Sequence, residues 1–390
     1  MLLKLIQNGV KMRKLLTTAL VVMLLVVASD LFAQLKITGD ARFRPRLDII
    51  DQTLDPKYDK ETSNVYFMYR LRLNLNWKIG DGYFLQSRLG HNGLAGYGVF
   101  GLGEQPTILG VYKDLGLNSA RMSLDIMLLN GGRATDTYGY KFGLFGADSY
   151  NNPIFDVHYY ASRMIDIPFF IFSNDGLFGA SGYYKAGPGK ITLAAIYDRP
   201  IGYESEDSNG NELYSINDQY SFYVDYNIKV ADWGVQPMAM MTVADSSTAP
   251  MTFGANITSP KLVGDLALGF SAIYSMNSVK NSEMKPDLKC FGMITNEYIA
   301  WKVRAKVSGK LGIGKLFAYI ELGKRDDTFD DASTSVTDFL YSWLGYSFTI
   351  YSGDAGKFII TPQWRHMSNT KDDVNILARE RIEMNFDFKF

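Results

Sequence analysis

The sequence contains one cysteine and three histidines in 390 residues. A single cysteine excludes a disulfide framework, and Cys290 is too far from the N-terminus to carry an N-terminal lipid. His91 and His158 have no companion at metal-ligand spacing, so we predict neither a metal site nor a cofactor. The formal net charge is −1, which provides no general attraction for nucleic acid.

The sequence also lacks a long apolar run. Its one strongly apolar stretch, residues 15–28, follows Arg13 and Lys14 and precedes the small residue Ala33. About 14 residues fall short of the ~20 that a transmembrane helix needs, and this layout is typical of a secretory signal peptide. We therefore predict a signal peptide over residues 1–33, with Met12 as the natural start, and one exported domain over residues 34–390.

Alternating residues dominate this exported part. From residue 64 to residue 79, apolar side chains such as Leu71 and Leu73 alternate with polar ones such as Arg70 and Arg72. A period of two is typical of a β-strand with one apolar and one wet face. Any membrane role must therefore rest on strands.

Connection lengths distinguish a membrane barrel from a soluble sandwich. Short Gly or Pro turns alternate with longer polar connections, as in outer-membrane barrels with short periplasmic turns and long external loops. The short turns lie at residues 80–82, 187–189, 259–261, 311–314 and 353–356, and the long connections at 50–63, 93–117, 200–215, 277–296 and 326–335. We predict an all-β, antiparallel up-and-down transmembrane barrel of about 18 strands. The pattern is weak over residues 130–180, which leaves 16 strands as the alternative.

The last predicted strand alternates as far as Phe390. Here the chain resembles Gram-negative outer-membrane proteins, in which a terminal Phe is the insertion signal read by the barrel-assembly machinery. As a whole it resembles the porin families of 16 to 18 strands, including the alginate-export-like group. The resemblance implies location in the cell outer membrane and contact with outer-membrane lipid and lipopolysaccharide, and it leaves a homotrimer open.

A group of basic residues falls on the polar, lumen-facing side of the predicted strands. Such a wall would favour anions by electrostatic selection. The alternative is that these cations only pair with Asp40, Asp48, Glu383 and Asp387. We interpret the chain as a porin-like channel for passive diffusion of small polar, chiefly anionic solutes. The predicted pore-lining residues are Arg42, Arg44, Arg46, Arg70, Arg72, Lys302, Arg304, Lys306, Arg379 and Arg381.

The connection from Asn92 to Asn118 carries Leu102, Ile108 and Leu109 among its glycines. Apolar residues are unusual in a loop that lies in water. Two placements remain open: a loop folded into the lumen that narrows it, and an external flap.

The predicted last hairpin suggests a second function. His366 and Ser368 share the lipid-facing side of one strand, and Glu380 lies on the same side of the next. The run His366 to Asn369 followed by Glu380 resembles the catalytic hairpin of the lipid A 3-O-deacylase family. That resemblance implies Ser368 as nucleophile, His366 as general base, Glu380 as the group that orients the imidazole and Asn369 as an oxyanion donor.

This resemblance covers about 25 residues and departs from the family at residues 370–373, where Thr-Lys-Asp-Asp replaces a small, Gly-containing run. The alternative function is therefore an acyl hydrolase acting on lipid A or phospholipid. A transporter of hydrophobic solutes would need an N-terminal plug. We predict a strand over residues 34–49 instead.

Overall fold

A computed structural model describes residues 35–52, 60–91, 98–101, 124–146, 154, 177–197, 205–206, 212–214, 220–243, 251–278, 297–329 and 331–390. The predicted signal peptide lies outside these residues and remains a prediction. No helix in this described part of the chain is long and apolar enough to cross a membrane. The strands are β1 (Leu35–Gln52), β2 (Lys60–Gly80), β3 (Tyr83–His91), β4 (Gly98–Gly101), β5 (Leu124–Ala134), β6 (Tyr138–Phe145), β7 (Leu177–Ala186), β8 (Gly189–Tyr197), β9 (Ser205–Glu206), β10 (Glu212–Tyr214), β11 (Tyr220–Val230), β12 (Trp233–Val243), β13 (Met251–Thr258), β14 (Ala267–Asn277), β15 (Glu297–Leu311), β16 (Gly314–Thr328), β17 (Thr334–Gly353), β18 (Gly356–Lys371) and β19 (Val374–Lys389).

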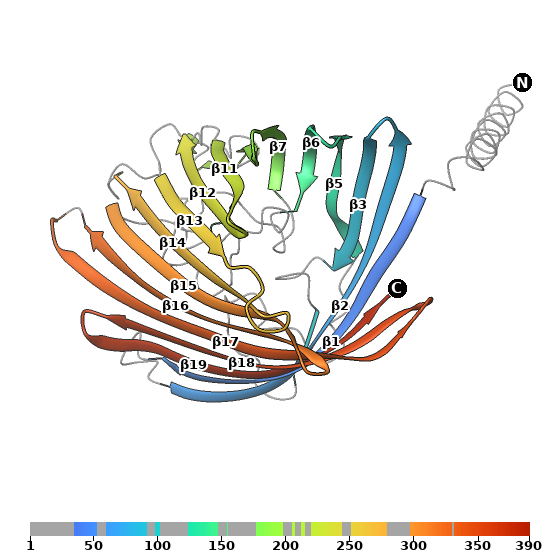
Figure 1. The fold of residues 1–390 in the computed structure, drawn as a ribbon. Coiled ribbons are helices and arrows are strands. Elements are labelled where there is room, and N and C mark those ends of the chain that lie inside the picture. Colours follow the sequence, from blue (N-terminus) through green and yellow to red (C-terminus); the bar gives the residue numbers. More distant parts are fainter. Residues whose placement is uncertain are drawn as a thin grey trace, which may run out of the picture.

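These strands form one antiparallel sheet that closes on itself (Figure 1). Most strands pair with their neighbours along the chain, β8 pairs with β11, β3 pairs with β5, and β19 pairs with β1 to complete the ring. β3 and β4 both pair with β2, at different heights, and so share one place in the wall. The short strands β9 and β10 form a separate hairpin. Within the described ranges the wall therefore has 16 strand positions. The predicted up-and-down barrel is confirmed, with the smaller of the two strand numbers.

Burial alternates along each strand because one face of the closed sheet encloses the interior. On β19, Arg381 and Glu383 are buried, whereas Ile382 and Met384 between and after them are exposed. On β1, Arg44 and Arg46 are buried while Phe43 is exposed. The polar face is thus inside and the apolar face outside, as a barrel in lipid requires.

The two ends of the barrel have different connections. At the end that carries the start of β1 and the end of β19, adjacent strands are joined by turns of a few residues, such as Asp81-Gly82 and Ala231-Asp232. Asp81, Ala231 and Asp232 have positive φ values, as tight hairpin turns require. At the other end most connections are longer, which confirms the predicted asymmetry. Two of the predicted long connections, 50–63 and 326–335, are shorter than predicted. β1 runs to Gln52 and β2 begins at Lys60, and β16 runs to Thr328 and β17 begins at Thr334.

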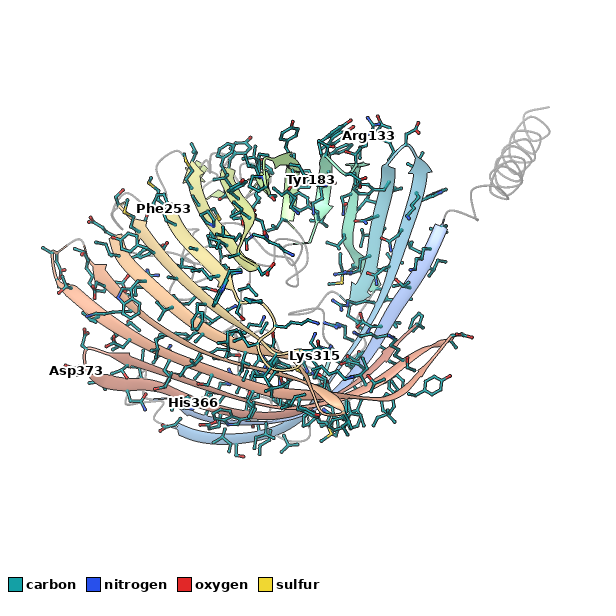
Figure 2. The ribbon with its side chains drawn as sticks, in the orientation of Figure 1. Arg133, Tyr183, Phe253, Lys315, His366 and Asp373 are labelled. Carbon is teal, nitrogen blue, oxygen red and sulfur yellow. The ribbon has the colours of Figure 1, made fainter. Side chains whose placement is uncertain are left out.

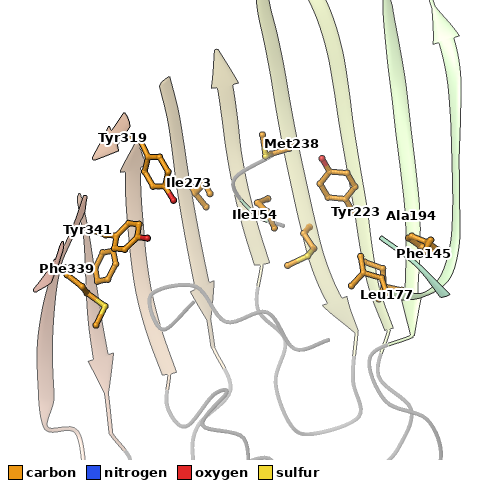
Figure 3. Packing of buried hydrophobic residues seen from close by; sticks show 13 residues of the cluster. Phe145, Ile154, Leu177, Ala194, Tyr223, Met238, Ile273, Tyr319, Phe339 and Tyr341 are labelled. Atoms are coloured by element: carbon orange, nitrogen blue, oxygen red, sulfur yellow. The ribbon is translucent and has the colours of Figure 1, made fainter. Parts of the chain in front are cut away.

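Strand length divides the wall into two sides. We call β15 to β19 with β1 and β2 the long side, because these strands have 15 to 21 residues. We call β3, β5 to β8 and β11 to β14 the short side, because these strands have 8 to 11 residues. Buried apolar side chains line much of the inner face of the short side, including Leu177, Tyr223 and Met238 (Figure 3).

Candidate functional site

Strand register brings the predicted basic residues together on the inner face of the long side. On β1 the even-numbered residues face inward, and Arg42 lies opposite Arg70 on β2 and Asp387 on β19. Asp48 lies opposite Arg381 on β19. Closure of the barrel between β1 and β19 therefore joins basic residues from the two ends of the sequence, as the sequence predicted.

Asp48 is the first centre of this network. Its fully buried carboxylate accepts hydrogen bonds from Arg379 Nε at 2.6 Å and from Arg381 Nη2 at 2.7 Å. The Tyr66 hydroxyl donates to the same carboxylate at 3.0 Å. Burying a carboxylate is costly unless hydrogen-bond donors compensate for the lost water, and here two charged guanidinium groups and one neutral hydroxyl do so.

Glu383 is the second centre. Its carboxylate is also fully buried and lies 2.6 Å from Arg46 Nη2 and 2.6 Å from Arg365 Nη2. Arg44 Nε lies farther away, at 3.8 Å, and donates instead to Asn385 Oδ1 at 2.5 Å. One carboxylate thus holds arginines from two different strands.

The third part of the network lies nearer the short turns. Asp40 pairs with Arg70 at 3.0 Å and with Arg72 at 2.8 Å, and Arg42 pairs with Asp387. The side chains of Arg42 and Arg72 are each 20% exposed, more than those of the other arginines in these pairs. Solvent inside the barrel therefore reaches the basic wall most readily here.

Cations outnumber acids in this network. The arginines pair with the four predicted acids and still exceed them in number, and selection of anions stays a prediction. The eight arginines are Arg42, Arg44, Arg46, Arg70, Arg72, Arg365, Arg379 and Arg381, and the four acids are Asp40, Asp48, Glu383 and Asp387.

In the second predicted basic strand, β15, two cations share one carboxylate. Arg304 lies opposite Glu321 in register and pairs with it, and Lys302 lies 3.8 Å from the same carboxylate. Lys306, two residues further along, is exposed. This strand contributes less excess charge than β1, β2 and β19 together.

Arg365 was missed as an inward-facing residue. It pairs with Glu383, and its guanidinium carbon lies 3.8 Å from the centre of the Trp343 ring. The signal was present in the sequence. If Trp364 and His366 face outward, strand alternation turns Arg365 inward.

The predicted inserted loop, Asn92 to Asn118, lies mostly outside the described residues. Its described part, Gly98–Gly101, is β4, which pairs with β2 in the wall. In the described chain, a different connection reaches the buried interior. Ile154, between β6 and β7, is 1% exposed and belongs to the apolar cluster of Figure 3, where it lies near Ile273 and Met238.

The hydrolase-like hairpin is partly assembled on the outer face. His366 lies opposite Glu380 in register, and His366 Nδ1 is 2.6 Å from Glu380 Oε1. Trp364 Nε1 donates to the other carboxylate oxygen at 2.7 Å, and its ring stacks with the imidazole. Ser368 lies opposite Ala378, one position further along the strand pair. Among the described contacts, no hydrogen bond joins Ser368 to His366. Asn369 is buried on the opposite, inner face, so the oxyanion role suggested for it is contradicted by its orientation.

Phe390 lies at the closing seam. Its backbone exchanges hydrogen bonds with Gly39 at 2.7 and 3.0 Å. A Cβ atom at Gly39 would lie 2.5 Å from the Phe390 ring, so only glycine leaves room for the terminal ring. This geometry explains how the last residue is accommodated. Its role as an insertion signal remains a prediction.

The described residues contain no group of three or more His, Cys, Asp or Glu that could hold a metal ion.

No protein-family model and no curated protein sequence matches the chain. Solved structures do match it. A loop-deletion mutant of OmpT, an outer-membrane protein of Vibrio cholerae, aligns with a TM-score of 0.53 and 11% identity, over 91% of this chain and 99% of that one.

Two further structures match over similar lengths. OmpT of Vibrio cholerae in a trimer form aligns with a TM-score of 0.51 and 11% identity, covering 91% of this chain and 99% of that one. An anion-selective porin from Comamonas acidovorans aligns with a TM-score of 0.53 and 11% identity, covering 91% and 100%. At such low sequence identities, these structural matches establish the fold alone. The chain therefore has the fold of the 16-stranded outer-membrane porins, and its apolar outer face is suited to contact with lipid.

Proposed function

We propose that this protein is a porin-like diffusion channel that favours small anions. The observation that carries the proposal is the excess of arginines over carboxylates on the inner face of the long side. Fixed cations along one wall of a water-filled barrel raise the local concentration of anions. Passive diffusion needs no cofactor and no reaction.

The positions of the charged side chains matter in this proposal, as well as their net charge. Asp48 and Glu383 are fully buried, so they hold the arginines in place more than they meet solutes. Arg42 and Arg72 are more exposed, and they are the side chains that a passing anion would meet first. A solute such as a small carboxylate or phosphate would replace part of its hydration with guanidinium contacts.

Planar-bilayer recording tests the proposal. Under a KCl gradient, the purified barrel should show conductance steps and a zero-current potential of the sign that means chloride preference. That preference should weaken as salt rises, because the Debye length falls from ~10 Å at 0.1 M to ~3 Å at 1 M. Membranes that stay closed at all voltages, or a preference for potassium, would contradict it.

The same recording tests the finer resemblance to the alginate-export-like group. A channel for acidic sugars should pass a monomeric uronate, or be blocked by it. A neutral hexose of the same size is the control. Equal behaviour of the two sugars would leave the general anion channel and remove the acidic-sugar interpretation.

We also propose a homotrimer, because one similar barrel, OmpT of Vibrio cholerae, has a trimer form. Native mass spectrometry in mild detergent should show three chains. A single chain across a range of detergents would count against it.

An acyl hydrolase remains the second candidate, favoured by the His366 to Glu380 contact on the outer face. In this candidate Glu380 orients the imidazole, and the free Nε2 would need to meet the Ser368 hydroxyl. Ser368→Ala, His366→Ala and Glu380→Ala should then each abolish the same activity. Mass spectrometry of lipid A and phospholipids from expressing cells measures it, and an acyl pattern unchanged by abundant folded protein would exclude these lipids as substrates.

A further inference from the structure

Four tyrosines surround an arginine on the outer face of the short side. Tyr83 on β3, Arg133 on β5 and Tyr140 on β6 lie side by side in register. Tyr138 and Tyr184 form the neighbouring cross-strand pair on β6 and β7. We call these five residues the Arg133 site. Figure 2 shows Arg133 at the edge of the barrel wall.

The Arg133 site faces outward, at the end of the barrel with short turns. Gly132 and Asn130 face inward and are buried, which turns Arg133 to the outside. The four tyrosines are between 39% and 57% exposed. A lipid-facing arginine costs about 2 to 4 kcal/mol at the bilayer midplane but only about 0 to 1 near the interface. Because β5 ends at Ala134, Arg133 lies at the interface, where aromatic girdles occur.

The guanidinium is held in a fixed position. Arg133 Nε donates to the Asp81 carbonyl at 2.9 Å and Nη1 donates to the Tyr138 hydroxyl at 2.7 Å. Its central carbon lies 5.0 Å from the centre of the Tyr83 ring and 5.7 Å from that of Tyr138. No carboxylate pairs with Arg133 in the described part of the chain. An oriented cation with unused N–H groups therefore faces the membrane interface.

On the side of Arg133 toward the membrane centre, one position of the outer face carries no side chain, and the exposed Leu129 lies beyond it. Gly131 precedes Arg133 by two residues on the same outer face, between Leu85 on β3 and Phe142 on β6. Leu85 and Phe142 are both exposed. A Cβ atom at Gly131 would make only ordinary contacts, with its nearest neighbour at 3.4 Å. Backbone geometry therefore does not require glycine at position 131. Because Gly131 has no side chain, a shallow apolar track lies between Leu85 and Phe142.

We propose that the Arg133 site binds the phosphate of a phospholipid head group, with one acyl chain lying along Gly131. A planar guanidinium suits a phosphate because it presents parallel N–H donors, and the charge-assisted bonds strengthen where water is scarce. The tyrosine hydroxyls add donors at the depth of the head groups. This inference goes beyond the channel function and depends only on the barrel's place in a bilayer.

Native mass spectrometry of the purified full-length barrel tests the site, with phosphatidylglycerol added at fixed ratios in detergent. Wild type should retain phosphatidylglycerol, and Arg133→Gln should reduce retention about tenfold, the expected effect of losing one charge-assisted contact of about 1.4 kcal/mol. Arg133→Lys should lose part of the retention because an ammonium cannot bind the phosphate in two places. Gly131→Val should also weaken retention, by filling the track.

Lys229→Gln is the control for net charge, because Lys229 shares the inward-facing register of Tyr223 and Asp225 and so does not face lipid. Lys229 lies near the same end of the barrel, on β11, with one residue between it and the turn to β12. Its replacement removes the same charge and should leave retention unchanged. Diacylglycerol, which lacks the phosphate, should bind weakly and equally to wild type and Arg133→Gln. Inorganic phosphate at the same concentration should not displace the lipid.

Each remaining outcome contradicts the proposal. Equal retention by wild type and Arg133→Gln would show that the arginine does not bind lipid. Displacement by inorganic phosphate would indicate an anion site without lipid specificity. Equal loss in Lys229→Gln would indicate a general charge effect. Heat-modifiable migration on gels confirms that every variant is folded.

Discussion

The long and short sides of the barrel enclose the same interior with different chemistry. On the long side, arginines from β1, β2, β18 and β19 converge on buried carboxylates. On the short side, the inner face carries apolar residues such as Met238 and Met240, with hydroxyl pairs such as Ser221 and Thr242 between them. The buried ion-pair network therefore lies on the long side, and short-side cations such as Lys141 and Lys190 contact aromatic rings instead.

The two sides also differ in what holds their inner residues. Neutral hydrogen bonds contribute about 1 kcal/mol each, so loss of one is tolerated. A buried ion pair is different, because removing one partner leaves an uncompensated charge, which costs about 3 to 5 kcal/mol. On the long side, a substitution that removes a buried charge therefore also lowers stability strongly. On the short side, loss of a neutral hydrogen bond lowers it only slightly.

The largest expected effect follows from Asp48→Asn. It leaves Arg379 and Arg381 without the carboxylate that they share, and should lower the free energy of unfolding by about 3 kcal/mol. Ser221→Ala on the short side removes one partner of the neutral hydroxyl pair with Thr242 and should cost about 1 kcal/mol. Urea unfolding in lipid vesicles measures both. Equal losses would remove the proposed difference between the sides.

Ion selectivity should change next most. Replacing Arg44, Arg72 and Arg381 together by Gln removes most of the arginine excess, so the anion-to-cation permeability ratio should fall toward one. The paired change Arg325→Gln with Asp327→Asn removes one opposite-charge pair on the same side and keeps the excess, so it should leave the ratio nearly unchanged. Lys190→Gln tests the short side, where the effect should be smaller. A larger change in the permeability ratio from Lys190→Gln than from the triple arginine change would place the selective charge on the short side and contradict the proposal.

Deletion of Phe390 should have a moderate effect, on assembly. The seam between β19 and β1 belongs to the long side, and Phe390 pairs with Gly39 at its end. We expect less folded protein in the outer membrane, measured by heat-modifiable migration of membrane fractions. Ile382→Ala, an exposed apolar change on the same strand, is the control and should insert normally. Normal insertion of the truncated chain would show that the terminal residue is not the signal.

The smallest expected effect concerns Asp372 in the β18–β19 turn. Its carboxylate accepts hydrogen bonds from the Val336 backbone N–H at 2.7 Å and from the Ser335 hydroxyl at 3.0 Å, which lower its pKa from the usual value near 3.8. A lowered folded-state pKa means that this contribution is fully present above the unfolded pKa and is lost as pH falls through the folded value. Asp372→Asn should flatten that acid-side loss slightly.

Asp265 is the matched case at the opposite end, on the short side. Its hydrogen bond and ion pair with Lys261 lower its pKa in the same direction. Both carboxylates are exposed, so the effects should be small and should decrease with salt. Thermal unfolding between pH 5 and pH 2, with and without each substitution, measures them. A stability gain at low pH in the wild type would contradict the assigned direction.

Local patterns explain why much of the barrel was predictable. Alternation at residues such as Arg70 to Leu73 assigns each side chain to a face, because the strand period of two leaves no other choice. The tight turns at one end of the barrel were also predictable, because a turn depends on residues that are adjacent in the sequence. The strand number was harder to predict, because β3 and β4 share one place in the wall, which no local pattern reveals.

The site was predictable only in part. The inward arginines and their four partner acids followed from alternation and from the closure of the first strand on the last. Arg365 shows the limit, because its partner Glu383 lies on the next strand and depends on register. The same holds for Arg133, whose tyrosines come from three strands.

The sequence by itself determined the strand-rich barrel, its two kinds of connection and the polar inner face, since each of these depends on neighbours along the chain. Tertiary structure decided the 16 strand positions, the sharing of Asp48 by Arg379 and Arg381, and the Ile154 side chain inside the apolar cluster. The physical reason is register. Contacts between strands distant in sequence depend on the offset at which they pair, and a shift of one residue would send every side chain to the opposite face.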